Sequence, residues 1–126
     1  MAEERFVFLD GDGIGDHIEL LLLDGKLSEA IALSQSISSA MRALRDLLQS
    51  IPGAKVKLYG GDDLIATFQE EPHLAQLNQL RHKFLELCGC TISIGVGASI
   101  QEALTNLRRA KLSGKDSIVG IETLKF

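Results

Sequence analysis

Two acidic, glycine-rich segments carry the residues whose types and spacing could do chemistry. The first is Asp10-Gly11-Asp12-Gly13-Ile14-Gly15, and the second is Gly60-Gly61-Asp62-Asp63. Carboxylates gathered in one place raise each other's pKa values unless a cation lies among them. Oxygen ligands of this kind suit Mg²⁺ or Mn²⁺, which can lower the pKa of a bound hydroxyl and stabilise charge on a phosphoryl group.

The elements around these segments decide whether the carboxylates meet. The apolar run 5–10 predicts a buried strand that ends at Asp10. Residues 54–59 and 64–68 predict two strands joined by a hairpin, in which Gly60 and Gly61 are expected to adopt positive φ. The remaining elements are expected to be helices over 18–23, 29–50 (capped by Ser28), 74–87 and 100–112 (capped by Ser99 with Glu102), and strands over 91–96 and 117–121.

This order of elements predicts an α+β fold. The sequence β-α-β-β-α-β, followed by an extra α-β, is the ferredoxin-like order, with an antiparallel sheet and helices packed on it. In such a sheet the first and third strands are adjacent and antiparallel, so the end of one meets the start of the other. Asp10 is therefore expected to lie beside Asp62 and Asp63, which favours a cation site over a solvated turn.

The composition bounds the class of protein. The chain has 126 residues, which predicts a single domain over residues 1–126. Hydrophobic residues make up 45% and charged residues 24%, as in globular domains, and the net charge of −4 argues against a surface that coats nucleic acid. The longest apolar run, 20–23, is too short for insertion into a membrane. Closely spaced Cys88 and Cys90, and the lack of a signal peptide, indicate a cytoplasmic protein.

Each acidic segment also has a plainer interpretation. Gly60–Asp63 can be a surface turn, and residues 10–15 can be a glycine-rich turn with no ligand. The first segment is neither an EF-hand loop, because Leu21 stands where the bidentate Glu belongs, nor a dinucleotide fingerprint, because Asp16 replaces the third glycine. The backbone N–H groups from Gly13 to Gly15 can instead cradle phosphates.

Basic residues at the end of the last predicted helix are the other candidates. Lys111 and Lys115 lie one helical turn apart and can face a shared anion. The alternative is a solvated basic end that complements the helix dipole. The histidines lack metal-ligand spacing, and Cys88 and Cys90 have neither the partners for zinc nor a recognisable base for nucleophilic catalysis.

Four spaced motifs together resemble a known family over nearly the whole chain. Tyr59-Gly60-Gly61-Asp62-Asp63-Leu64 is similar to the signature hairpin of GGDEF diguanylate cyclases and of CRISPR polymerase palm domains, and Asp10 resembles their first metal aspartate. Segments 91–96 and 110–116 resemble the following strand and the late Ala-Lys-x-x-Gly-Arg-Asn motif. The small size and the Asp-Gly-Asp-x-Ile-Gly loop make the chain most similar to the minimal CRISPR polymerase (mCpol) family.

The resemblance implies a palm-type nucleotidyltransferase that acts on nucleoside triphosphates. It implies that Asp10, Asp62 and the Gly11 carbonyl hold Mg²⁺ or Mn²⁺, two ions per active site, with Asp63 as a further ligand or as the activator of the attacking hydroxyl. Lys111 and Lys115 are then expected to hold the triphosphate. The nucleotide is expected to contact two further groups of residues: Gly11, Asp12, Gly13, Ile14 and Gly15 in the first loop, and Gly60 and Gly61 in the hairpin.

Two departures from the diguanylate cyclase pattern favour ATP. Ile18 stands where those enzymes carry a guanine-binding asparagine, and Asp63-Leu64 replaces Glu-Phe. The resemblance thus implies a synthase of a cyclic di- or oligonucleotide in antiphage signalling, read by an effector protein. One small domain holds one donor, so a homodimer with facing sites is expected, without a nucleic-acid template. The alternatives are a catalytically silent nucleotide sensor and a ferredoxin-like interaction module.

Overall fold

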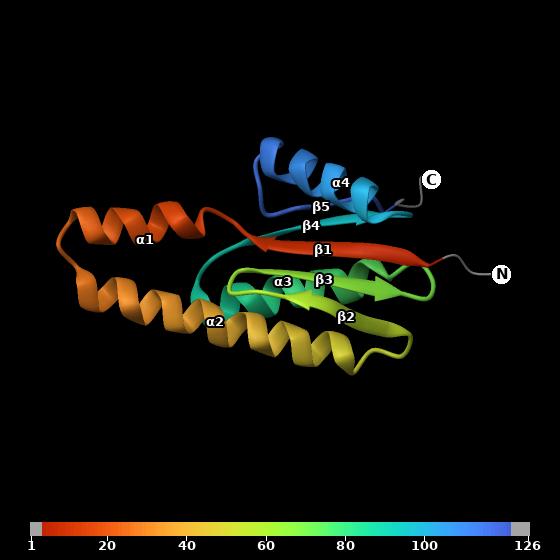
Figure 1. The fold of residues 1–126 in the computed structure, drawn as a ribbon, viewed down its shortest axis with the longest axis horizontal. Coiled ribbons are helices and arrows are strands. Elements are labelled where there is room, and N and C mark those ends of the chain that lie inside the picture. The colour runs from red at the N-terminus through yellow and green to blue at the C-terminus, as the bar shows by residue number, and fades with distance from the viewer. Residues whose placement is uncertain (1–3, 122–126) are drawn as a thin grey trace.

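The computed structural model describes residues 4–121, and a β-sheet forms its middle layer (Figure 1). The strand order is β2-β3-β1-β4-β5, so β1 is paired on both sides. Described along the chain, the elements are β1 (Arg5–Gly11), α1 (Ile14–Leu23), α2 (Leu27–Gln49), β2 (Ala54–Tyr59), β3 (Asp63–Phe68), α3 (Leu74–Cys88), β4 (Ile92–Gly97), α4 (Ile100–Leu112) and β5 (Ile118–Val119).

The predicted α+β class and the ferredoxin-like order are confirmed. β1 pairs antiparallel with β3 and with β4, whereas β5 joins β4 in parallel, so the added strand makes the sheet mixed. Helices α2 and α3 cover one face of the sheet and α4 covers the other (Figure 1). The core lies mainly between the sheet and α2 and α3, and its largest fully buried side chains are Phe84, Leu9, Met41, Leu44, Leu48, Leu64, Leu77, Leu80, Ile92, Ile94, Val7 and Val96.

Several boundaries differ from those predicted, each for a local reason. α1 begins at Ile14 rather than residue 18, because Gly13 at φ 64° turns the chain directly into the helix. α2 begins at Leu27 after Lys26, so Ser28 is not its cap. The last strand covers only Ile118–Val119 of the predicted 117–121. Ser99 caps α4 as predicted, since its hydroxyl accepts a hydrogen bond from the Glu102 amide at 3.1 Å.

The turn chemistry predicted for the β2–β3 hairpin is wrong. Neither Gly60 nor Gly61 lies in the left-handed region. β2 itself is an edge strand, with Lys55 and Lys57 exposed and a register irregularity against β3 between Val56 and Leu58. The two glycines are therefore not required by the backbone conformation of the turn.

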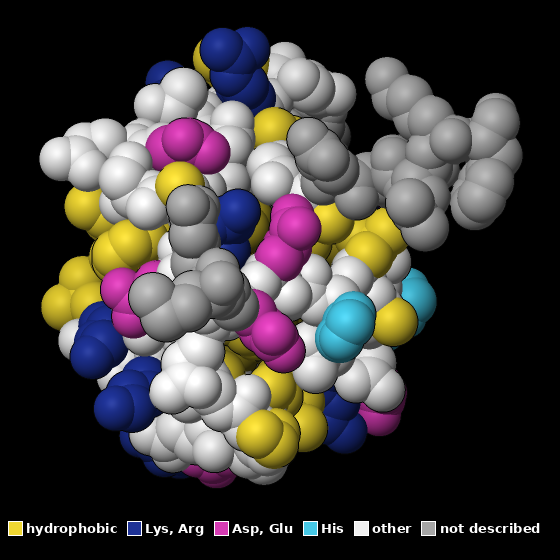
Figure 2. Space-filling model, turned by 90° about the vertical axis from the view of Figure 1, so that its right-hand side faces the viewer, with side chains coloured by type: hydrophobic (Ala, Val, Ile, Leu, Met, Phe, Trp, Pro, Cys, Tyr) yellow, Lys and Arg dark blue, Asp and Glu magenta, His cyan; other side chains and the backbone are white. Residues whose placement is uncertain are grey.

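The far end of the molecule, where β1 begins, has a mixed surface. Figure 2 shows basic, acidic, histidine and apolar side chains interspersed there, without a continuous patch of one kind on the described part. A cavity of about 470 Å³ lies near this end between residues 51–53 and 68–73. Among the described residues, no helix has both the length and the apolar character needed to cross a membrane.

Close contact between α4 and β4 sets how far α4 reaches toward the end of β1. A Cβ atom on Gly95 would overlap the Ala103 carbonyl oxygen and the Leu107 amide nitrogen of α4. A Cβ atom on Gly97 would lie 2.5 Å from the Ala103 amide nitrogen. The helix backbone thus rests directly on the strand backbone, which only glycine allows.

We expect Gly95→Ala to lower the free energy of unfolding by about 2–3 kcal/mol, because the added methyl group must push the α4 backbone away. Urea unfolding measures this loss. Gly15→Ala is the matched control: a Cβ there meets nothing within 4 Å and Gly15 is helical, so its stability should stay equal or rise. Equal stability of Gly95→Ala and the wild type would contradict the close packing.

Candidate functional site

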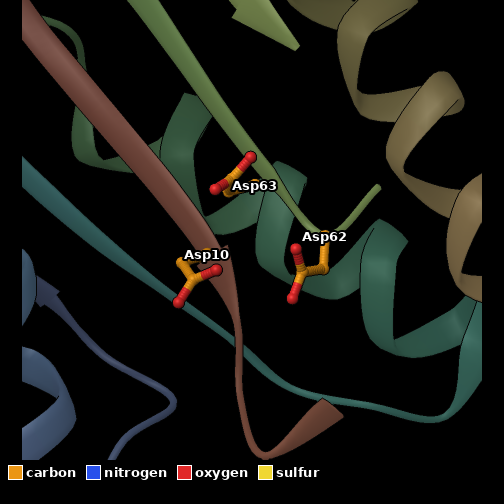
Figure 3. Close-up of side chains that lie close together, drawn as sticks. All are labelled: Asp10, Asp62 and Asp63. Atoms are coloured by element: carbon orange, nitrogen blue, oxygen red, sulfur yellow. The ribbon is translucent and has the colours of Figure 1, made fainter. Parts of the chain in front are cut away.

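Three carboxylates meet where β1 ends and β3 begins (Figure 3). Asp10 is the register partner of Asp63 in the antiparallel pair, and Asp62 precedes β3. One oxygen from each of Asp10, Asp62 and Asp63 lies within 4.8 Å of the others. The Gly11 amide donates to the Asp62 carbonyl at 2.9 Å and fixes the hairpin against β1. The convergence predicted from the strand order is confirmed.

The glycines of the hairpin make room for this cluster. A Cβ atom on Gly60 would lie 2.5 Å from Asp63 Oδ1, so a side chain there would displace the carboxylate. Gly61 has nothing within 4 Å of the corresponding position, so it leaves open space beside the acids. The Gly-Gly pair therefore leaves space for the carboxylates and is not needed for the conformation of the turn.

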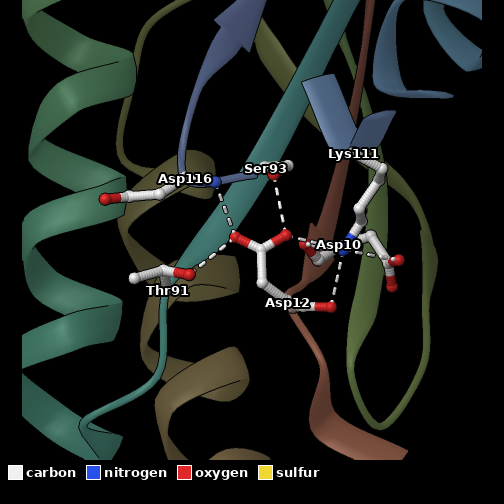
Figure 4. Close-up of polar contacts among 7 residues, drawn as sticks. Asp10, Asp12, Thr91, Ser93, Lys111 and Asp116 are labelled. Atoms are coloured by element: carbon white, nitrogen blue, oxygen red, sulfur yellow. Dashed lines mark hydrogen bonds and ion pairs between the residues drawn. The ribbon is translucent and has the colours of Figure 1, made fainter. Parts of the chain in front are cut away.

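Asp12 lies on the other side of the loop and is turned into the protein (Figure 4). Its buried carboxylate accepts hydrogen bonds from Thr91 Oγ1 and Ser93 Oγ at 2.7 Å, Lys111 Nζ at 2.8 Å and the Asp116 amide at 2.9 Å. Burial alone would raise the pKa of Asp12, but these four donors outweigh it and lower the pKa below its ordinary value. Asp12 is thus an anionic anchor that ties the β1–α1 loop to β4 and to the turn after α4.

Lys111 joins the anchor to the acidic cluster. Its Nζ donates to the carbonyl oxygens of Asp10 at 3.1 Å and Gly11 at 2.7 Å, and it lies 3.1 Å from Asp10 Oδ2. The Lys111 side chain is only 15% exposed. Because an ammonium has three N–H donors, these partners and Asp12 already saturate it. Lys111 was predicted to hold the triphosphate and the Gly11 carbonyl to hold a metal ion, but in the structure these two groups are hydrogen-bonded to each other.

The charge of the cluster is only partly compensated. Burial raises the pKa of Asp10, Lys111 opposes that rise, and the neighbouring Asp62 and Asp63 add to it. The pKa of Asp10 lies above its ordinary value of 3.8 as a result. A divalent cation with oxygen ligands suits such a surplus of negative charge. Within residues 4–121, this is the one group of three or more acidic, histidine or cysteine side chains that lies close enough to hold a metal.

A cavity of about 560 Å³ opens onto the acids. One wall is formed by Asp10, Asp62 and Asp63, and Gly13 and Gly15 line it at the start of α1. The side toward α4 is basic and apolar, with Arg108, Lys111, Lys115, Leu104, Leu107 and Leu112. Of the residues predicted to contact nucleotide, Gly11, Gly13, Ile14, Gly15, Lys111 and Lys115 line this cavity, whereas Asp12, Gly60 and Gly61 do not.

Three polar residues of this region were missed by the sequence analysis. Arg108 lies one turn before Lys111 on α4 and lines the same cavity, so helical spacing from Lys111 was the available signal. Thr91 and Ser93 lie two residues apart, and the hydroxyl groups of both donate hydrogen bonds to Asp12. Both cysteines are free thiols: Cys90 is buried, and burial is the main cause that raises the pKa of the Cys88 thiol to about 11.

We expect Asp10→Asn to stabilise the metal-free protein at pH 7, by roughly 2 °C in its unfolding midpoint. The raised pKa means that folding disfavours the ionised Asp10. Folded Asp10 takes up its proton above 3.8, so the wild type recovers stability as the pH falls toward that value, and the difference between the proteins should shrink over this range.

Thermal unfolding at several pH values, with and without Mg²⁺, checks this expectation. Added Mg²⁺ should raise the midpoint of the wild type and leave that of Asp10→Asn nearly unchanged. A lower midpoint for Asp10→Asn at pH 7, or an equal response to Mg²⁺ in both proteins, would contradict it.

Solved structures with the same fold include complexes of the Csm1-Csm4 cassette and of a GGDEF domain. The Csm1-Csm4 cassette in complex with AMPPNP aligns at a TM-score of 0.75 and 17% identity, over 94% of this chain and 21% of that one. The same cassette with cA4 aligns at 0.73 and 15% identity, over 91% and 20%. The GGDEF domain of DgcB from Caulobacter crescentus, in complex with c-di-GMP, aligns at 0.63 and 14% identity, over 92% and 76%.

These likenesses establish a common fold of the palm and GGDEF type. The chain spans about a fifth of the length of the Csm1-Csm4 chains that it matches. Among curated proteins, none matches this sequence. The sequence model of the minimal CRISPR polymerase domain, by contrast, matches residues 6–121, which contain all three converging acids, Lys111 and Lys115. The chain therefore belongs to the minimal CRISPR polymerase (mCpol) domain family.

Proposed function

We propose that this chain is a metal-dependent nucleotidyltransferase that condenses nucleoside triphosphates into a cyclic di- or oligonucleotide. One observation carries the proposal: the Asp10, Asp62 and Asp63 oxygens lie within 4.8 Å of one another and face Arg108 and Lys115 across a cavity of about 560 Å³. A phosphoryl-transfer site needs carboxylates that can hold a metal ion and, opposite them, basic side chains that can hold phosphates. Membership of the mCpol family supports the same reaction class.

In the proposed reaction, a ribose hydroxyl of one nucleotide attacks the α-phosphorus of another. A new P–O bond forms, the bond from the α-phosphorus to the bridging oxygen of the β-phosphate breaks, and pyrophosphate leaves. Asp10 and Asp62 would hold Mg²⁺ or Mn²⁺, which when bound supplies charge neutralisation at the phosphoryl group. Asp63 would be a further ligand or accept the hydroxyl proton. Lys115, together with the N–H groups at the start of α1, would hold the triphosphate.

Lys111 has a different place in this proposal from the one its motif implies. Its ammonium already serves four protein oxygens, those of Asp10, Gly11 and Asp12. To bind a phosphate it must give up at least one of these partners. Arg108 and Lys115 line the same cavity and carry the remaining positive charge, so we assign most of the phosphate binding to them.

ATP is the proposed substrate. Solved relatives of this fold are in complex with ATP and with cyclic oligoadenylates, and Ile18 cannot offer the hydrogen bonds with which an asparagine would recognise guanine. We propose that the product is a second messenger in cytoplasmic antiphage defence, read by a separate effector protein. A nucleotide sensor without turnover is the alternative, and the first experiment below separates the two.

We expect the purified protein to convert ATP, with Mg²⁺ or Mn²⁺, into a cyclic product and pyrophosphate. Mass spectrometry after incubation with each of the four nucleoside triphosphates, singly and mixed, identifies the base and the ring size. Asp62→Ala/Asp63→Ala should lower the rate by about 10³-fold or more, since it removes two of the three acids.

The control for this variant is Glu70→Ala/Glu71→Ala. It removes an equal charge from an exposed pair that lines the cavity at the far end of β3, and it should leave the rate unchanged. No product, with metal-dependent ATP binding retained, would favour the sensor. Equal rates for the two double variants would contradict the proposed site.

We expect two copies of the chain to act together, because one cavity of this size holds one donor nucleotide and the acceptor must come from elsewhere. Light scattering should show a dimer at working concentrations. Mixing equal amounts of the wild type and Asp62→Ala/Asp63→Ala should reduce the yield of cyclic product to about a quarter of that from the same total amount of wild type. The reason is that random pairing leaves a quarter of the dimers fully intact. A reduction to only one half would indicate that each copy works alone.

A further inference from the structure

The turn between α4 and β5 has an unusual backbone. Gly114, Lys115 and Asp116 follow one another with φ values of 115°, 65° and 49°. Glycine adopts positive φ freely, but lysine and aspartate do so at a cost, so the surrounding structure must hold them there. The Lys115 amide donates to the Ala110 carbonyl at 2.9 Å, which closes the end of α4 but leaves Asp116 to be held by something else.

Arg81 of α3 holds Asp116 from outside the site. Its Nη2 donates to the Asp116 carbonyl oxygen at 2.6 Å and to Asp116 Oδ1 at 2.7 Å. Its Nη1 donates to Asn78 Oδ1 at 2.7 Å, which fixes the guanidinium on its own helix. The Arg81 side chain is 20% exposed, so these contacts are partly shielded from water. The grip on both the backbone and the side chain of Asp116 restrains the turn.

The restrained turn delivers two groups to the site. The Asp116 amide donates to Asp12 Oδ2 at 2.9 Å, but Asp12 keeps three other donors, Thr91, Ser93 and Lys111, without it. The neighbouring Lys115 lines the cavity, and its Nζ lies 3.7 Å from the position that a Cβ atom would take on Gly13. The left-handed conformation at Lys115 thus presents its ammonium at the start of α1, beside Gly13, which also lines the cavity.

We infer that Arg81 is a positioning residue for the phosphate-binding end of the site. It does not line the cavity, and it acts by holding residues 114–116 in the left-handed conformation that presents Lys115 to an anion. The inference rests on the proposed function for the identity of that anion, the triphosphate of a nucleotide. The inference gives α3, which packs on the face of the sheet opposite α4, a role in substrate binding that none of the sequence motifs indicates.

Arg81→Met and Lys115→Met test the inference by steady-state kinetics and by binding. Both should raise KM for ATP about tenfold and change kcat by less than about threefold, because the lost contact binds phosphate before reaction as well as during it. The double variant should be no worse than Lys115→Met alone, since Arg81 acts through Lys115. Asp116→Asn, which keeps an acceptor for Arg81 and tolerates positive φ, should behave like the wild type.

Lys83→Met is the matched control. It removes a positive charge from the same helix, at a side chain whose ion pair with Glu86 spans 3.8 Å, and KM should stay unchanged. Hydrogen exchange of residues 113–117 should quicken in Arg81→Met and not in Lys83→Met, because without Arg81 the turn opens more often and the Asp116 amide then leaves Asp12 Oδ2. Faster exchange with an unchanged KM for ATP would overturn the inference, since Arg81 would then serve only stability. Additive effects of Arg81→Met and Lys115→Met would overturn it too.

Binding of inorganic tripolyphosphate separates this inference from the proposed function. Suppose that the wild type makes no product from any nucleoside triphosphate. The proposed function then fails, but weaker tripolyphosphate binding by both Arg81→Met and Lys115→Met would still support the positioning role. If these two variants bind tripolyphosphate as tightly as the wild type, the inference is wrong whatever the protein synthesises.

Discussion

The Lys111 ammonium is the interaction on which the rest of the site depends. Asp10 lies near the end of β1 and Asp12 directly follows the strand, and both are partly or fully removed from water. Without a cation between them, two such carboxylates would repel each other and the loop between β1 and α1 would not close. Lys111 contacts both carboxylates, together with the two backbone carbonyls at the end of β1. One side chain thereby fixes the loop conformation and the direction of the Asp10 carboxylate.

The position of Lys111 is in turn a consequence of packing far from any charge. α4 approaches β4 backbone to backbone because Gly95 and Gly97 carry no side chains. Where a helix covers an ordinary strand, a layer of side chains separates the two backbones. The glycines remove this layer and lower the helix toward the sheet. Only then does a lysine at the end of α4 reach the carbonyl oxygens at the end of β1.

Much of the fold and the acidic cluster could be predicted from the sequence, because both depend on local patterns. Strand alternation gave the order of elements, and antiparallel pairing of the first and third strands placed Asp10 beside Asp63. The role of Asp12 could not be predicted in this way. Its four donors come from β4 and the residue before it, from α4 and from the turn after α4, and only the tertiary structure brings them together. The same reason hid the contact of Arg81 with Asp116, which joins residues far apart in the chain.

The exposed lysines of β2 restrict how copies of this chain can meet. β2 is an edge strand whose backbone groups on one side have no partner within the described sheet. Lys55 and Lys57 are exposed along it, and the irregularity between Val56 and Leu58 interrupts its regular ladder. Charged side chains and bulges are the devices by which natural sheets prevent edge-to-edge growth into larger assemblies. Continuation of the sheet from one copy into the next through β2 is thus disfavoured, so the proposed dimer would form through another surface.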